Sequence, residues 1–150
     1  MPPKAIVIYD DDCGFCRWSL ALLLRRDRGA LRPLPLGTPE ADYLLHDLTP
    51  AERDASWHLV IDPPAGAGPE QLSFDAGPAR FSAGAAFAPA LSFLPRGRRW
   101  AAVVARIPGP TERTYRWIAD HRGLLGRLVT RRARRRADQV IAARSARSRP

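Results

Sequence analysis

The sequence lacks the long apolar runs that membrane insertion or secretion requires. Its first apolar stretch, residues 5–9, is followed at once by three aspartates. A membrane-spanning helix needs about 18 apolar residues, and a secretory signal needs a longer apolar region than this. We therefore expect a cytoplasmic protein without a transmembrane segment. The 150 residues are enough for one domain with a single core.

Metal-ligating residues are also scarce. The chain has two cysteines, Cys13 and Cys16, and three isolated histidines, at positions 46, 58 and 121. A structural zinc site needs four ligands, and a disulfide between residues three apart closes too small a loop to restrain the unfolded chain much. A zinc site and an inert pair of thiols remain open. The spacing favours a third interpretation, a redox dithiol that requires no metal and no cofactor.

The two cysteines lie between a predicted strand and a predicted helix. Residues 5–9 are rich in β-branched side chains and bounded by charge, which is typical of a buried strand. Residues 14–26 contain four leucines and no proline, and they predict a helix. Two thiols on the first turn of a helix can form a disulfide, and the unpaired N–H groups and dipole at that end stabilise a thiolate.

Residues 9–17 resemble the DCC family of predicted thiol-disulfide oxidoreductases, whose hallmark is Asp-x-x-Cys-x-x-Cys after a first strand. Asp10, Cys13 and Cys16 fall on this pattern, and residues 106–122 are similar to the family's C-terminal segment. The resemblance covers residues 4–128 and implies a thioredoxin-like α/β fold with a small central mixed sheet. Beyond it we expect a helical C-terminal extension.

Two features differ from the patterns of related proteins. Asp11 stands where members of the family usually carry Gly, so the approach to Cys13 is more acidic. Thioredoxin itself has a cis-proline before its third core strand, whereas the corresponding strand here, residues 57–61, follows Ala55-Ser56. We therefore expect the peptide clamp of thioredoxin to be absent.

The position of each cysteine predicts its role. Cys13 lies at the exposed helix start and resembles the attacking cysteine of thioredoxin-like sites, whereas Cys16 lies about a turn further in. We expect Cys13 to attack a substrate disulfide and Cys16 to resolve the mixed disulfide. The expected partners are therefore a substrate disulfide and an electron donor.

Four neighbours are expected to support the pair. Arg17, folded back one turn, would lower the pKa of Cys13, while the aspartates would raise it. Asp12 is expected to cap the helix. Asp10 is predicted either to cap the helix or to relay protons to Cys16. Gly14 is expected to let a partner approach the sulfur.

The other strands and helices are predicted from residue composition and from the residues that typically begin or end such elements. Strands are predicted at residues 31–36 and at 57–61. The first has two prolines and should either pair on one side only or be irregular. Further short strands are considered at 72–74 and ending at 81–82. Thr49-Pro50-Ala51-Glu52 predicts a capping box. Helices are expected from Gly84 to Leu94 and from Thr111, as the N-cap, to His121.

Positive charge is concentrated at the C-terminus. Residues 131–150 carry +7 of the net charge of +9. We assign 4–128 to the thioredoxin-like domain and 129–150 to a basic tail that is helical and then disordered from Ser145. Either this helix is solvated, or it contacts an anionic membrane or nucleic acid. Contact with an anionic surface would support a rival function, that of a non-enzymatic adaptor. Whether the helix is solvated or bound to such a surface, we expect the fold to survive removal of residues 131–150.

Overall fold

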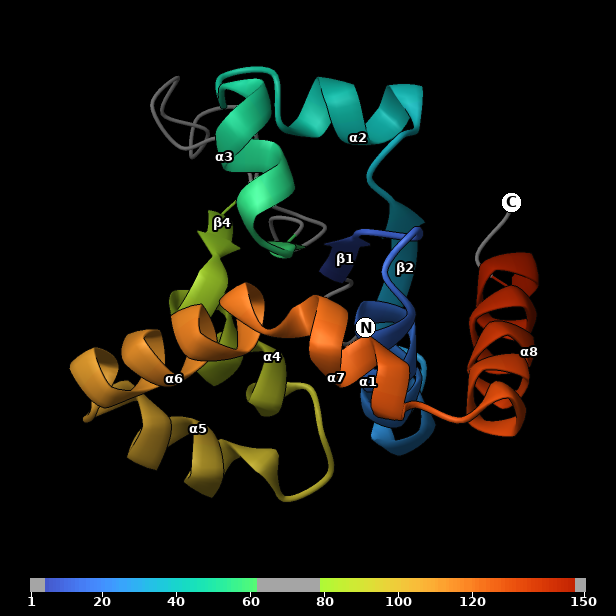
Figure 1. The fold of residues 1–150 in the computed structure, drawn as a ribbon. Helices are drawn as coiled ribbons and strands as arrows, with labels where there is room; N and C mark the ends of the chain where they lie inside the picture. The colour runs from blue at the N-terminus through green and yellow to red at the C-terminus, as the bar shows by residue number, and fades with distance from the viewer. Residues whose placement is uncertain (1–4, 62–78, 148–150) are drawn as a thin grey trace, which may run out of the picture.

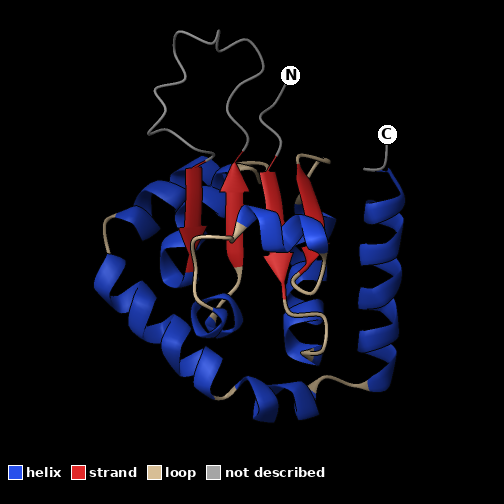
Figure 2. Cartoon of the chain, turned by 90° about the horizontal axis from the view of Figure 1, so that it is seen from above, coloured by secondary structure: helices blue, strands red, loops and turns tan. Residues whose placement is uncertain are grey.

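The computed structural model describes residues 5–61 and 79–147. Its centre is a four-stranded sheet in the order β2-β1-β3-β4, flanked by helices (Figures 1 and 2). β1 pairs parallel with β2 and antiparallel with β3, and β3 pairs antiparallel with β4. The strands are β1 (Ala5–Tyr9), β2 (Leu31–Pro35), β3 (His58–Ile61) and β4 (Ala79–Ser82). The expected α/β thioredoxin-like fold with a mixed sheet is confirmed.

Helices cover both faces of the sheet and form the C-terminal half of the chain. They are α1 (Gly14–Arg26), α2 (Pro39–Leu44), α3 (Pro50–Ala55), the 3-10 helix η1 (Ala83–Ala86), α4 (Phe87–Ser92), α5 (Gly97–Ala105), α6 (Pro108–Asp120), α7 (Arg122–Leu128) and α8 (Arg131–Arg147). Among the described residues, none of these helices combines the length and the apolar character that crossing a membrane requires.

The central strand β1 explains why the sheet forms here. All five of its residues are buried, because successive side chains point to opposite faces and each face is covered. Val7 and Tyr9 pack with Leu20 and Leu24 of α1. Ile6 and Ile8 pack on the opposite face with residues of α2 and of the segment that follows it, Ala41 and Leu45 among them.

Several predicted elements agree closely with the structure. β2 pairs with β1 alone, as its two prolines predict. The capping box at Thr49 and Glu52 is present at the start of α3. The strand predicted to end at residues 81–82 is β4, whereas the short strand considered at 72–74 lies outside the described residues.

The helix predicted from Thr111 begins earlier. α6 starts at Pro108, with Ile107 as its N-cap, and the Thr111 hydroxyl donates to the Ile107 carbonyl within the first turn. Pro108 and Pro110 do not prevent this earlier start, because proline is tolerated in the first helical turn, where an N–H has no intrahelical partner. The prediction that Thr111 caps this helix is therefore wrong.

The basic C-terminal helix packs against the domain. α8 runs beside α1, buries Ala137 and Ile141, and adds Ile141 to the apolar cluster on that face of the sheet. This part of the chain is therefore a packed helix and not a solvated one, and it stays helical to Arg147, two residues beyond the point from which disorder is expected.

A buried ion pair fastens α8 to the end of α1. Arg144 Nη1 lies 2.5 Å from Asp27 Oδ2, and the side chains are 9% and 0% exposed. Arg144 also donates to the Leu24 carbonyl, while the Asp27 carboxylate accepts the N–H groups of Gly29, Ala30 and Leu31. One carboxylate thus organises the turn into β2 and holds α8 in place.

Candidate functional site

The two cysteines lie where β1 leads into α1, with Cys13 as the N-cap residue. Its Sγ accepts the backbone N–H of Cys16 at 3.2 Å, and both thiols are free and partly buried. The expectation that Asp12 caps the helix is wrong, because the helix begins one residue later than that role requires. The Cys13 sulfur instead satisfies one of the unpaired N–H groups at the helix start.

Asp10 faces both sulfurs. One of its carboxylate oxygens and the sulfurs of Cys13 and Cys16 all lie within 4.8 Å of one another. Oδ1 accepts the backbone N–H of Asp12 at 3.0 Å, which shapes the turn before the helix. Oδ2 lies 3.7 Å from Nη1 of Arg122, the first residue of α7.

These three groups are also the only cluster among the described residues that could offer a metal ion three ligands of this kind. A structural zinc site needs a fourth. The three side chains are therefore one ligand too few for a structural zinc site.

Cys16 is the more strongly perturbed thiol. Burial raises its pKa far above the usual range, and the hydrogen bond and charge of Cys13 and the charge of Asp10 act in the same direction. Arg122 opposes them by lowering the pKa. Cys16 therefore holds its proton at neutral pH.

The outer side of α1 is covered by α8. Arg17, expected to fold back toward Cys13, instead forms an ion pair with Asp138 of α8, with 3.4 Å between Nη1 and Oδ1. A Cβ atom on Gly14 would lie 3.2 Å from Nε of Arg134. Arg134 in turn donates to the Gly126 carbonyl in α7. The space left by Gly14, where we expected a partner to approach the sulfur, is thus occupied by an arginine of the C-terminal helix.

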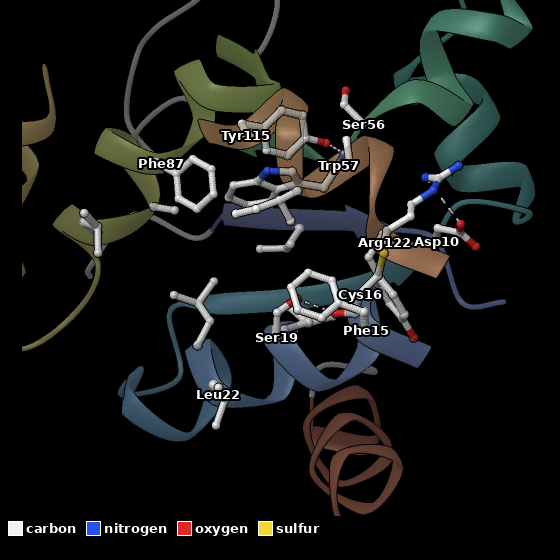
Figure 3. A pocket seen from close by; sticks show the side chains of 18 of the residues that line it. Asp10, Phe15, Cys16, Ser19, Leu22, Ser56, Trp57, Phe87, Tyr115 and Arg122 are labelled. Carbon is white, nitrogen blue, oxygen red and sulfur yellow. Dashed lines mark hydrogen bonds and ion pairs between the residues drawn. The ribbon is translucent and has the colours of Figure 1, made fainter. Parts of the chain in front are cut away.

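An apolar cavity of about 410 Å³ begins at Cys16 (Figure 3). Most of its wall is hydrocarbon from α1, α4 and α6. Asp10 and Arg122 meet at the end that Cys16 lines, whereas Arg26 lines the cavity from the last residue of α1. Phe15, Leu22, Trp57, Phe87, Tyr115 and Ile118 are among the side chains that line it. Cys13 is not part of the wall.

Three aromatic residues frame one side of this cavity. Phe87 meets the rings of Trp57 and Tyr115 edge-on, with centroids 5.4 and 6.0 Å apart. The Tyr115 hydroxyl accepts the backbone N–H of Trp57 at 3.3 Å. Burial raises the pKa of Tyr115, so the phenol stays neutral.

Sequence reasoning assigned no role to Arg122, Tyr115 or Trp57. Arg122 and Tyr115 lie in the segment that resembles the family's C-terminal part, and this resemblance was the only indication in the sequence that they could matter. Because they are about a hundred residues from Cys16 along the chain, the sequence did not show that they lie beside it.

A Cys-x-x-Cys pair at the start of the first helix, after the first strand of a mixed sheet, defines the class of thioredoxin-like dithiol proteins. The comparisons agree at the level of the family: residues 7–128 match the DCC1-like thiol-disulfide oxidoreductases. The chain belongs to this family, and membership together with the cysteine pair supports a redox role. None of the curated proteins and none of the solved structures matches the chain.

Proposed function

We propose that the protein is an enzyme that catalyses thiol–disulfide exchange, with Cys13 as the attacking and Cys16 as the resolving cysteine. The observation that carries this proposal is the hydrogen bond from the Cys16 backbone N–H to the Cys13 sulfur. A donor at a helix N-terminus stabilises negative charge on that sulfur, while burial keeps Cys16 protonated.

The reaction has two exchange steps. The Cys13 thiolate attacks one sulfur of a substrate disulfide, forms a mixed disulfide and releases the first substrate thiolate. Cys16 then loses its proton and attacks the Cys13 sulfur, which forms the Cys13–Cys16 disulfide and releases the second thiolate. Both thiolates are protonated on release, so the substrate gains two electrons and two protons and the protein dithiol loses them. An external thiol donor reverses the change in the protein.

Asp10 is placed to receive the proton of Cys16. Its carboxylate lies within 4.8 Å of both sulfurs, and the ion pair with Arg122 orients it. Once Cys13 is in a mixed disulfide, a base near Cys16 speeds formation of the second thiolate. Asp10→Asn should therefore slow the second step and spare the first.

Two cysteine variants test the assignment. Reduced protein is incubated with bis(2-hydroxyethyl) disulfide at neutral pH and analysed by intact mass spectrometry. Cys16→Ser should accumulate a mixed disulfide, because the resolving thiol is gone, whereas Cys13→Ser should show little adduct, because the remaining thiol stays protonated. Equal adducts on both variants would contradict the assignment, and protection of both thiols by added zinc would indicate a metal site.

A cytoplasmic location is part of the proposal, since a dithiol there rests mostly reduced and forms disulfides transiently. The rival function, an adaptor that binds an acidic surface through residues 131–150, stays a prediction with no observation in its favour. The exchange assay separates the two, because the thiols of an adaptor need not cycle.

A further inference from the structure

The cavity beside Cys16 has the size and lining of a small-molecule site. Its volume of about 410 Å³ lies in the range of about 300–1,000 Å³ that ligand pockets occupy. Partly buried apolar side chains face it from three helices, Leu23, Leu91 and Ile118 among them. Such a wall gains free energy when hydrocarbon replaces water against it.

The charged groups at the cavity offer little to a charged ligand. Arg122 faces the Asp10 carboxylate at the sulfur end. Arg26, the other guanidinium of the wall, is exposed and donates to the Leu22 carbonyl of its own helix. A ligand carrying several charges, such as glutathione disulfide, would have to lose hydration against the hydrocarbon that makes up most of the wall, which costs free energy.

The backbone next to the site is also closed to a peptide. The N–H of Trp57 donates to Tyr115, and its carbonyl accepts the N–H of Ala83 at 3.2 Å. β3, which follows, is paired on both sides, with β1 and with β4. An extended peptide substrate binds by adding hydrogen bonds to an open strand edge, and this part of the sheet provides none. No cis peptide bond occurs among the described residues.

We propose that this cavity binds an uncharged hydrocarbon arm of the substrate, so that the preferred substrates are small apolar disulfides. The inference rests on the proposed exchange function and specifies its substrate class. One arm lies in the cavity between α1 and α6, and the disulfide bond lies at the polar end, where the sulfurs of Cys13 and Cys16 are within 4.8 Å of each other. Cys13 attacks the bound disulfide and Cys16 completes the exchange, giving two apolar thiols and the protein disulfide.

The test uses two disulfides of matched length. Di-n-propyl disulfide carries a methyl group where bis(2-hydroxyethyl) disulfide carries a hydroxyl. The rate constant of the reduced full chain is measured with each, and the ratio is divided by the same ratio for free dithiothreitol, which removes intrinsic reactivity. We expect a corrected ratio of at least about tenfold in favour of the propyl compound, since an apolar pocket discriminates a methyl group from a hydroxyl of the same size by up to about 100-fold.

A variant pair locates the preference. Ala119 lines the cavity from α6 and is partly buried, so Ala119→Phe should fill the cavity and lower the corrected ratio to near one. Ala102→Phe places the same side chain at an exposed position of α5 and should leave the ratio unchanged. A series of dimethyl to dibutyl disulfides needs no variant: the corrected rate should rise with each methylene.

The outcomes are distinct. The proposed substrate class is overturned if both compounds are exchanged with a corrected ratio near one, or if the corrected rate does not rise from dimethyl to dibutyl disulfide. Neither result contradicts the exchange function. A higher rate with glutathione disulfide or with a disulfide-linked peptide than with the propyl compound also overturns it. Absence of exchange with every disulfide overturns the proposed function itself, and the inference with it.

Discussion

Two helical regions follow the sheet, α8 on one side and α5–α6 on the other, and in each the degree of burial is the opposite of what its composition suggests. α8 contains seven arginines in seventeen residues, yet it buries Ala137, Ile141 and even Arg144. α5 and α6 carry the two tryptophans of the C-terminal half of the chain. These are among the most exposed large apolar side chains, Trp100 at 65% and Trp117 at 57%. No residue of α6 is fully buried.

The difference lies in what each helix meets. α8 lies along α1, where small and branched side chains at helical spacing fit the partner and Asp27 neutralises the one buried guanidinium. α6 lies over the apolar cavity, and it contacts the domain through Tyr115 and through Glu112, whose carboxylate accepts the Gly84 N–H at 3.0 Å. One helix closes the core and the other leaves space beside Cys16. Their energetic contributions should differ accordingly.

Deletion of residues 131–150 should have the largest effect. It exposes the apolar surface of α1 that Ile141 and Ala137 cover and leaves Asp27 without its arginine, so we expect a loss of at least about 3 kcal/mol in the free energy of unfolding. Urea denaturation followed by circular dichroism measures it. An unchanged midpoint would restore the expectation from sequence, in which the fold survives without this segment.

Arg144→Ala should have the next largest effect, about 3 kcal/mol or slightly less. Breaking a buried ion pair leaves the carboxylate of Asp27 buried with only backbone donors. Arg135→Ala is the matched control, because Arg135 is exposed on the same helix, and it should change stability by less than about 0.5 kcal/mol. Equal losses in the two variants would show that α8 is held by its net charge and not by this contact.

Tyr115→Phe should cost less, about 1–2 kcal/mol, because it leaves one backbone N–H of Trp57 without its acceptor while the ring contacts remain. The control on the same helix is Trp117→Phe, an exposed position where we expect less than about 0.5 kcal/mol. Thermal unfolding of both variants provides the measurement. A larger loss at Trp117 would mean that the exposed face of α6 is covered by a partner in solution.

Much of the site follows from local chain properties. The dithiol, its place between β1 and α1, and the order of strands and helices around it were predicted because hydrophobic periodicity and the Cys-x-x-Cys spacing act over a few residues. The helix cap was less predictable. Cys13, and not Asp12, is the N-cap residue, because the first residue of α1 depends on the path of the chain after the end of β1. Arg17 was assigned to the sulfur because Asp138, its partner, is more than a hundred residues away in sequence.

The sequence by itself determined that this chain has a Cys-x-x-Cys dithiol at a helix start and a buried first strand, because short-range patterning is enough to specify both. Only the tertiary structure decided that Arg122 and Tyr115 join the site, that α8 closes the core through Arg144, and that a cavity adjoins Cys16. Each of these depends on contacts between segments distant along the chain. Helix composition shows which face is apolar, but it does not show which surface that face will meet.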